Sequence, residues 1–245
     1  MKVLVTGHEG YIGKHLMKFL ADKNFIVSYY GGDLLKRPWE DMISTWDIVV
    51  HLAGLAGVRR SFDEPEEYYK NNVELSRRIF KFCERTQTPV IYASSSNAHE
   101  WWLNPYATTK KMLEEMASML TVPNIGMKFH TVWPGRSDML YERLKANQVE
   151  YINEDHYRDW IHIDDMCEAL FTIIQNYDII EQSVVDIGTG HMTPVSEVAT
   201  KFGFSGEWRK GEAVGERMHT RANVDYLLSL GWTPKRNILN EAPNT

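Results

Sequence analysis

The chain has 245 residues, a formal net charge of −6 and a pI near 5.9. This length allows one α/β unit with a modest appendage and is too short for three lobes. An acidic chain lacks the basic surface that nucleic acid requires, and no apolar run approaches membrane-spanning length. We therefore expect a protein that binds neither nucleic acid nor membrane.

Cysteine usage and the N-terminal residues indicate the compartment. Cys83 and Cys167 each lie inside an amphipathic segment, which predicts buried thiols and no disulfide framework. Met1 and Lys2 lead directly into a predicted strand, so we expect no signal peptide. Both observations favour a reducing cytoplasm. We also predict no metal site.

The residues from 6 to 13 read Thr-Gly-His-Glu-Gly-Tyr-Ile-Gly, after a β-branched run and before a segment of helical periodicity. A strand, a glycine turn and a helix in this order are typical of dinucleotide-binding sites. Gly7 allows the tight turn, Gly10 lets the backbone approach a pyrophosphate, and Gly13 lets the helix lie close to the sheet. The N–H groups at the helix start would then face the phosphates.

The second predicted strand, residues 25–30, bears on the choice of cofactor. In dinucleotide folds an acidic residue about twenty positions beyond the glycines usually binds the adenosine ribose. Asp33 follows the strand and could serve the ribose or the adenine, whereas Lys36 and Arg37 could equally bind a 2′-phosphate. The residues therefore leave NAD and NADP open.

Two further strands are predicted to end in residues suited to a site. Residues 47–54 form an apolar run that ends in small residues, and residues 89–96 form another that ends in Ser94, Ser95 and Ser96. In the next predicted helix Tyr106 and Lys110 lie four residues apart, on one face. A neighbouring ammonium and an oxidised nicotinamide would favour the phenolate of a tyrosine, so this pair could remove a proton from an alcohol.

The rest of the chain continues the alternation of strands and helices. A strand is predicted within 124–132, a helix within 138–146, a second helix up to residue 175, and a last strand within 183–190. We expect residues 1–132, completed by 158–190, to form the cofactor-binding domain. The region 133–245 should supply a substrate-binding cap, because the residues after 190 are too few for an independent domain.

Several of these motifs, in one order, resemble the extended short-chain dehydrogenase/reductase family of NAD-dependent nucleotide-sugar epimerases and dehydratases. The resemblance covers nearly the whole chain, and the stretches that carry it are residues 6–13, 51–54, 65–73, 94–96, 106–110 and 158–165. It implies a Rossmann-like doubly wound parallel α/β sheet, a small C-terminal substrate-binding lobe, and a homodimer.

The resemblance also implies roles for individual residues. Ser96 would hydrogen-bond the sugar hydroxyl, Tyr106 would be the acid/base, and Lys110 would hold the ribose and lower the pKa of the tyrosine. The implied substrate contacts are Arg59, Ser96, Thr131, Arg158, Arg209 and Arg217. Among these, Arg158 would bind the sugar-nucleotide diphosphate and Arg209 would be a second such arginine, with Arg217 as the alternative to Arg209. The implied cofactor contacts are Gly7, His8, Gly10, Tyr11, Ile12, Gly13, Asp33, Leu34, Leu52, Ala53, Gly54, Asn72, Ala93, Ser94, Tyr106, Lys110 and Phe129.

Three departures from the family pattern mark a shortened form. Tyr30 leads almost directly to Asp33, so one helix and strand of the sheet are predicted to be missing. The connection from Ser96 to Tyr106 is shorter than in the family and carries two tryptophans. Thr131 stands where the family has an asparagine.

The residues after Ser96 help to choose the reaction. A 4,6-dehydratase needs an Asp-Glu pair there and a fucose-synthase-type enzyme needs a nearby cysteine, but this chain has Asn97 and Ala98. Hydride chemistry alone remains, which favours an NAD-dependent 4-epimerase of a nucleotide-diphosphate sugar. An NADP-dependent reductase of a keto sugar or other carbonyl and a non-catalytic NAD(P)-binding protein are the alternatives. The loop 56–61 resembles that of uronate 4-epimerases, which indicates an acidic sugar.

Overall fold

A computed structural model describes residues 1–211 and 213–241. Its centre is a six-stranded sheet in the order β10-β5-β4-β3-β1-β2, in which every neighbouring pair is parallel. The order of the strands along the chain reverses beside β1, which is the point where open α/β sheets bind ligands. The strands are β1 (Lys2–Thr6), β2 (Ile26–Tyr29), β3 (Ile48–His51), β4 (Val90–Ser95), β5 (Asn124–Phe129) and β10 (Val184–Ile187).

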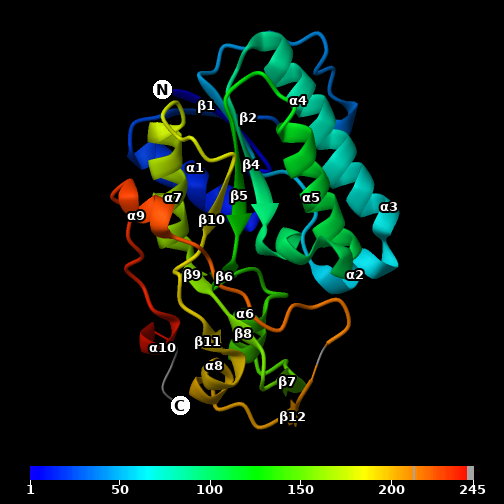
Figure 1. Cartoon of the computed structure of the whole chain (residues 1–245), viewed down its shortest axis with the longest axis vertical. Coiled ribbons are helices and arrows are strands. Elements are labelled where there is room, and N and C mark those ends of the chain that lie inside the picture. Colours follow the sequence, from blue (N-terminus) through cyan, green and yellow to red (C-terminus); the bar gives the residue numbers. More distant parts are fainter. Residues whose placement is uncertain (212, 242–245) are drawn as a thin grey trace.

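Helices cover both faces of this sheet, as a parallel sheet requires (Figure 1). On one face lie α1 (Tyr11–Asp22) and α7 (Ile163–Asn176), and on the other α4 (Leu75–Thr86) and α5 (Pro105–Ala117). Alternate residues of β1 supply the two cores, since Val3 and Val5 pack in one cluster and Leu4 in the other. The predicted doubly wound α/β fold is therefore confirmed.

The connection between β2 and β3 is short. It holds only the 3-10 turn η1 (Leu34–Lys36), so β2 is an edge strand of the sheet, as the missing helix and strand predict. Tyr30, Trp39 and Trp46 fill this region, and both tryptophan rings contact Phe82 of α4.

The helical region after β3 is broken into pieces. It comprises α2 (Val58–Asp63), α3 (Pro65–Tyr68), a π-helical turn η2 (Tyr69–Glu74), and then α4. Pro65 stands in the first turn of α3, where its missing N–H costs no hydrogen bond. The π-helical turn carries Asn72, and such turns are frequent at functional sites.

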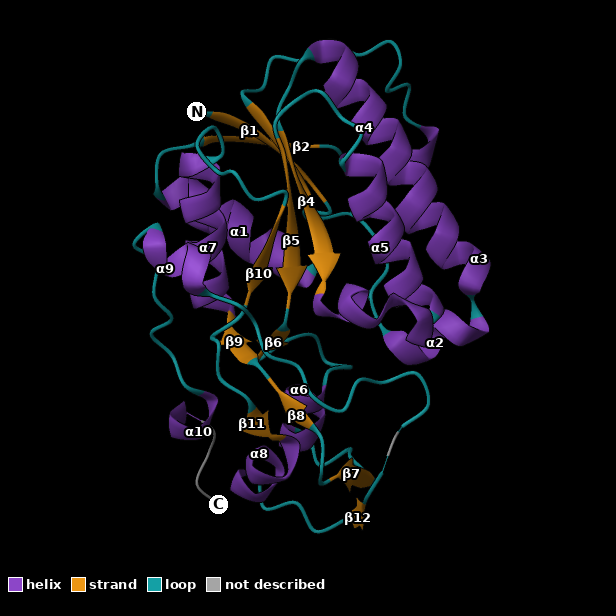
Figure 2. Ribbon diagram, viewed as in Figure 1, coloured by secondary structure: helices purple, strands orange, loops and turns teal. Residues whose placement is uncertain are grey.

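A smaller lobe lies beyond the carboxyl ends of the large sheet (Figure 2). It is built from two-stranded pairings of β6 with β9, β7 with β12 and β8 with β11, around a core that contains Trp133, Trp160 and Val198. Its elements are β6 (Thr131–Trp133), α6 (Leu140–Lys145), β7 (Tyr151–Asn153), β8 (Tyr157–Arg158), β9 (Trp160–His162), β11 (Thr193–Pro194), α8 (Val195–Lys201), β12 (Glu207–Arg209) and α10 (Ile238–Glu241). The chain also returns to the large sheet, where α9 (Asp225–Ser229) lies beside α7.

Candidate active site

The glycine turn between β1 and α1 has the geometry that a pyrophosphate site needs. Gly7 has φ +75°, and a Cβ there would lie 2.6 Å from the backbone nitrogen of Ala53. A Cβ at Gly13 would lie 2.1 Å from the carbonyl oxygen of Gly7, so neither position accepts a side chain. Gly10 begins α1 without a side-chain cap. The N–H groups of the first turn therefore remain available to an anion, which fits the pyrophosphate of a dinucleotide.

The other predicted cofactor residues flank this turn. Leu52, Ala53 and Gly54 follow β3, Ala93 and Ser94 lie in β4, and Phe129 ends β5, so all of them lie toward the carboxyl ends of their strands. His8, in the turn, stacks on Tyr29 at the end of β2, with 4.1 Å between ring centroids. Tyr11 and Ile12 open α1 and pack against the core on that side of the sheet.

The region after β2 places the predicted ribose residue. The carboxylate of Asp33 accepts a hydrogen bond from the backbone N–H of Leu35 and lies 3.6 Å from Nζ of Lys36. Arg37 covers the ring of Tyr30, 4.0 Å from its centroid, and donates to the carbonyl of Gly31. Both cations that could bind a 2′-phosphate thus have partners in the protein. Leu34 packs against the core on the α4 side.

Asn72 ties the loop after β3 to α5. Its Oδ1 accepts from the backbone N–H of Leu55 at 2.7 Å, and its Nδ2 donates to the Leu55 carbonyl at 3.0 Å and to Thr109 Oγ1 at 2.9 Å. Both amide hydrogens are used in these contacts. The buried amide therefore fixes the distance between the cofactor side of the site and the helix that carries Tyr106.

Tyr106 and Lys110 lie together on α5, as their spacing predicts. Both side chains are buried, and Nζ of Lys110 lies 6.0 Å from the ring centroid of Tyr106. The ammonium donates to the carbonyl of Ala93 in β4 at 2.8 Å. This bond anchors the first turns of α5 to the end of β4. The ring of Tyr68 meets Tyr106 edge-on, 6.1 Å between centroids.

Burial sets the protonation of this pair. It raises the pKa of the Tyr106 phenol, and a hydrogen bond with Ser95 acts in the opposite direction. Burial also lowers the pKa of Lys110 to about 8. The protein alone therefore does not ionise the tyrosine. A positive charge beside the ring, such as an oxidised nicotinamide, is needed to favour the phenolate.

The three serines at the end of β4 have different partners. Ser94 donates to Glu114 of α5 at 2.5 Å, whereas Ser95 is the serine that hydrogen-bonds Tyr106. Ser96 begins the 3-10 segment η3 (Ser96–Leu103), and its carbonyl accepts from Nη1 of Arg217 at 2.9 Å. The predicted contact of Ser96 with the sugar hydroxyl stays a prediction. Ser95 was not assigned from the sequence, because three consecutive hydroxyls carry no signal for which one meets the tyrosine.

Three of the four predicted arginines converge beside η3 and α2. Arg59 of α2 and Arg158 of β8 both bind the carboxylate of Glu216, and Arg217 binds Ser96 and Glu100. Thr131 begins β6, and its backbone N–H donates to the carbonyl of Asp159, the residue after Arg158.

Arg209 lies apart from that group. It pairs with Glu207 and its guanidinium lies 3.8 Å from the ring centroid of Tyr151. Arg59 also faces that ring, at 5.8 Å, so Tyr151 links Arg209 to the other arginines.

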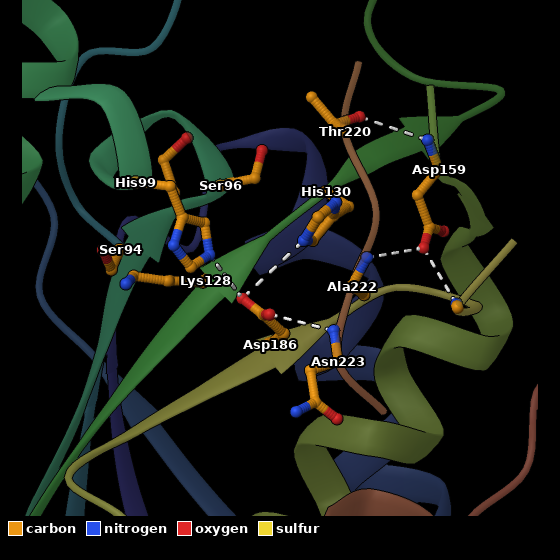
Figure 3. A network of polar contacts seen from close by, with 12 residues as sticks. Ser94, Ser96, His99, Lys128, His130, Asp159, Asp186, Thr220, Ala222 and Asn223 are labelled. Carbon is orange, nitrogen blue, oxygen red and sulfur yellow. Dashed lines mark hydrogen bonds and ion pairs between the residues drawn. The ribbon is translucent and has the colours of Figure 1, made fainter. Parts of the chain in front are cut away.

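A polar network holds the C-terminal segment against the site (Figure 3). The buried carboxylate of Asp159 accepts from the backbone N–H groups of Thr189, Gly190 and Ala222, at 2.7, 2.8 and 3.0 Å. Asp186 of β10 accepts from His99 of η3 at 3.3 Å and from the N–H of Asn223 at 3.0 Å.

His130 completes the second carboxylate cluster. Its Nε2 lies 3.7 Å from Asp186, and its side chain is buried. Burial raises the pKa of the Asp186 carboxyl, but His130 and His99 together hold that pKa well below its usual range. A permanently charged carboxylate therefore joins η3, the start of the smaller lobe and the C-terminal segment.

Arg136 is a second residue that sequence reasoning did not assign. It follows Gly135, whose φ of +90° turns the chain after β6, and Asp138 holds its guanidinium through two bonds of 2.9 Å. Its charge acts against the rise that burial causes in the pKa of both Tyr106 and Tyr68. A fixed cation thus contributes to the electrostatics of the tyrosine.

The described residues contain neither a membrane-spanning helix nor a cluster suited to a metal ion. Within 1–211 and 213–241, no helix is long and apolar enough to cross a membrane. Over the same ranges, no group of three or more His, Cys, Asp or Glu side chains could hold a metal ion. Cys83 and Cys167 are both buried free thiols.

Known proteins resemble this chain in sequence and fold. Protein CapI of Staphylococcus aureus is 29% identical over 233 residues, 71% of this chain and 70% of its own. A probable UDP-glucuronate 4-epimerase of Rhizobium meliloti is 29% identical over 229 residues, 69% of this chain and 67% of its own. The solved structure of MoeE5 in complex with UDP-glucuronic acid and NAD superposes with a TM-score of 0.84 at 26% identity, over 98% of this chain and 95% of that one.

The family assignment rests on a match over most of the chain. The model of the NAD dependent epimerase/dehydratase family matches residues 3–188, which include the glycine turn, the serines after β4, the Tyr106–Lys110 pair and Arg158. The predicted family, the enzyme class and the NAD cofactor are confirmed. The chain belongs to the NAD dependent epimerase/dehydratase family.

Proposed function

We propose that this chain is an NAD-dependent epimerase of a nucleotide-diphosphate sugar, which oxidises one sugar hydroxyl, at C4, and reduces the resulting ketone on its other face. The observation that carries the proposal is the cluster of Ser95, Tyr106 and Lys110 at the carboxyl end of β4. In the same edge of the sheet, the uncapped glycine turn offers N–H groups to a dinucleotide.

The chain's own residues supply the proton transfer. Tyr106, as the phenolate, takes the proton of the sugar hydroxyl at its phenol oxygen and returns it when the ketone is reduced. Ser95 holds that phenol oxygen, and we assign Ser96 to the sugar hydroxyl. Lys110 and Arg136 favour the ionised tyrosine by charge. NAD, when bound, accepts the hydride and gives it back.

The remaining predicted residues are assigned to binding. The first turn of α1 would hold the pyrophosphate of the cofactor, and Asp33 would hold its ribose. Asn72 would keep the loop after β3 at a fixed distance from α5 on the nicotinamide side. Arg59 and Arg158 would bind the diphosphate of the sugar nucleotide, since a planar guanidinium matches phosphate geometry. We assign Arg217 and Thr131 to the sugar, and Arg209 with Tyr151 to the nucleotide.

An acidic sugar is the first substrate to test. Arg136 places a cation next to Tyr106, where a sugar carboxylate would find a partner. The relative from Rhizobium meliloti carries the name of a UDP-glucuronate 4-epimerase, and MoeE5 was solved with UDP-glucuronic acid. The name of that relative supports UDP-glucuronic acid, whereas MoeE5 was also solved with UDP-glucose, so the neutral sugar nucleotide is tested beside the acidic one.

The test incubates the purified protein with UDP-glucuronic acid or UDP-glucose and follows the C4 epimer by NMR. We expect conversion without added cofactor, because the cofactor is regenerated in each cycle. Tyr106→Phe is the matched control and should give none. A requirement for stoichiometric NADPH, with a reduced product, would instead indicate a keto-sugar reductase. Binding of NAD with no turnover of either sugar nucleotide would indicate a non-catalytic protein.

Two broader proposals accompany the reaction. We propose a homodimer, by resemblance to the family, which light scattering of the purified protein tests directly. We also propose a cytoplasmic location, because two buried free thiols suit a reducing compartment. Fractionation of the source cells tests the second.

A further inference from the structure

Residues 213–220 form a strap that crosses from the smaller lobe to the Rossmann domain. The carbonyl of Gly215 accepts from Nδ2 of Asn104 at 2.9 Å, and a Cβ at Gly215 would lie 2.6 Å from the ring of Phe62. Arg217, two residues later, donates to the carbonyl of Ser96. The strap is thereby fixed to α2 and η3, and this contact sets the position of the residue between them, Glu216.

The carboxylate of Glu216 lies between two arginines from different lobes. Its Oε1 lies 3.1 Å from both Nε and Nη2 of Arg59, and its Oε2 lies 3.4 Å from Nη2 of Arg158. The side chain of Glu216 is 20% exposed and that of Arg158 17%. The contact with Arg158 is therefore only partly screened by solvent, whereas Arg59 is 60% exposed and its contact with Glu216 is more strongly screened.

The donors of Arg158 are almost all in use. Nη1 donates to the carbonyls of Tyr157 and Met218, and Nη2 contacts Nδ1 of His156 and the carboxylate of Glu216. A guanidinium has five N–H donors, so among the described residues only the Nε–H of Arg158 has no partner. A phosphate that binds this arginine through both terminal nitrogens must replace one of these acceptors.

Glu216 is the acceptor that a phosphate can replace most readily. The other three belong to the backbone of the strap and of β8 or to a buried imidazole, and they cannot leave without moving the fold. The Glu216 side chain can rotate, and its negative charge would repel a phosphate that arrived beside it. Its contact with Arg59 would be lost in the same movement.

We propose that Glu216 is an internal counter-ion that competes with the diphosphate of a nucleotide sugar for Arg59 and Arg158, so that binding requires displacement of its carboxylate. The inference rests on the proposed function, in which these arginines bind the diphosphate. It makes Glu216 a residue that limits affinity and speeds release of the nucleotide. A carboxylate that merely oriented the arginines would have the opposite effect.

The test measures UDP affinity of the purified, NAD-containing protein by titration calorimetry. Glu216→Gln should bind UDP about tenfold more tightly than wild type, because a charged hydrogen-bond partner no longer competes. Glu216→Ala should change affinity in the same direction. Glu64→Gln is the matched control, since Glu64 pairs with Arg60, the neighbour of Arg59, and should leave UDP affinity within about twofold.

Each result decides the proposal. Unchanged or weaker UDP binding by Glu216→Gln and Glu216→Ala, with wild type binding normally, overturns it and makes Glu216 a contact that supports the ligand. Equal tightening by Glu64→Gln also overturns it, because the effect would then be one of net charge. If wild type and all variants fail to bind UDP, the diphosphate role of the arginines is refuted. The proposed competition between Glu216 and the diphosphate is then refuted as well.

Discussion

Removal of the Asp159 carboxylate should destabilise the whole protein, because it is the acceptor for a buried cluster of donors. Asp159 is 0% exposed. Its two oxygens accept from three backbone N–H groups and from the hydroxyl of Thr189, at 2.7 to 3.0 Å. Asp159→Ala leaves these donors, from the end of β10 and from the C-terminal segment, without an acceptor.

The loss of stability can be estimated from the number of buried donors that lose their acceptor. A buried donor without an acceptor costs about 1–3 kcal/mol, and water that enters the space left by the carboxylate reduces this toward the lower end. Three backbone donors then give a loss of about 3–5 kcal/mol. For a chain of this size each kcal/mol lowers Tm by about 2–4 °C, so we expect a fall of about 10 °C.

The assay is thermal unfolding followed by circular dichroism. Asp159→Asn should lose less than Asp159→Ala, because its oxygen can serve one pair of donors while its amide faces the other pair. Asp178→Ala, which removes an exposed carboxylate near the end of α7, should leave Tm unchanged. If Asp159→Ala unfolds within about 1 °C of wild type, the buried network does not hold the C-terminal segment.

Three further outcomes are expected. Tyr106→Phe should abolish epimerisation while the denatured protein still releases bound NAD; normal turnover would remove Tyr106 from the mechanism. Ser95→Ala should lower kcat by about tenfold, and more than Ser96→Ala, because Ser95 is the serine bonded to Tyr106; the reverse order would contradict this geometry. Burial lowers the pKa of His51 to about 3. Its value in the unfolded chain is about 6.5, so wild type should lose about 2 kcal/mol of stability between pH 7 and pH 5 from this group. In urea unfolding, His51→Asn should lose less of its free energy of unfolding between pH 7 and pH 5 than wild type does. Equal losses in both proteins would contradict this role of His51.

Features that depend on neighbours along the chain were predicted from the sequence. The glycine turn is local, because Gly7 and Gly13 are needed where the backbone itself comes too close for a Cβ. The strands follow from short apolar runs, and the shared face of Tyr106 and Lys110 follows from the 3.6-residue period of a helix. These short-range rules predicted the sheet and the proximity of this pair, whereas the edge position of β2 followed from comparison with the family pattern.

Residues 64–85 show where local rules were insufficient, because their helical periodicity predicts one continuous helix. The structure divides this region by a π-helical turn at Tyr69–Glu74. The turn places Asn72 so that its amide meets Leu55 and Thr109. Helical periodicity gives no sign of one extra residue in a turn, because the contact that stabilises it comes from another part of the chain.

Only the tertiary structure decided which polar groups meet in the site. Ser95 was indistinguishable from Ser94 and Ser96 until the start of η3 fixed the end of β4 against α5. Arg59 and Glu216 are 157 residues apart, and Arg158 and Glu216 are 58 apart. The sequence by itself thus determined the fold, which follows from local backbone geometry and from motifs that resemble the family, and it predicted Tyr106 as the acid/base. The pairing of charges was left to tertiary structure, since a carboxylate selects its arginine by proximity in space, which the chain acquires only when both lobes have folded.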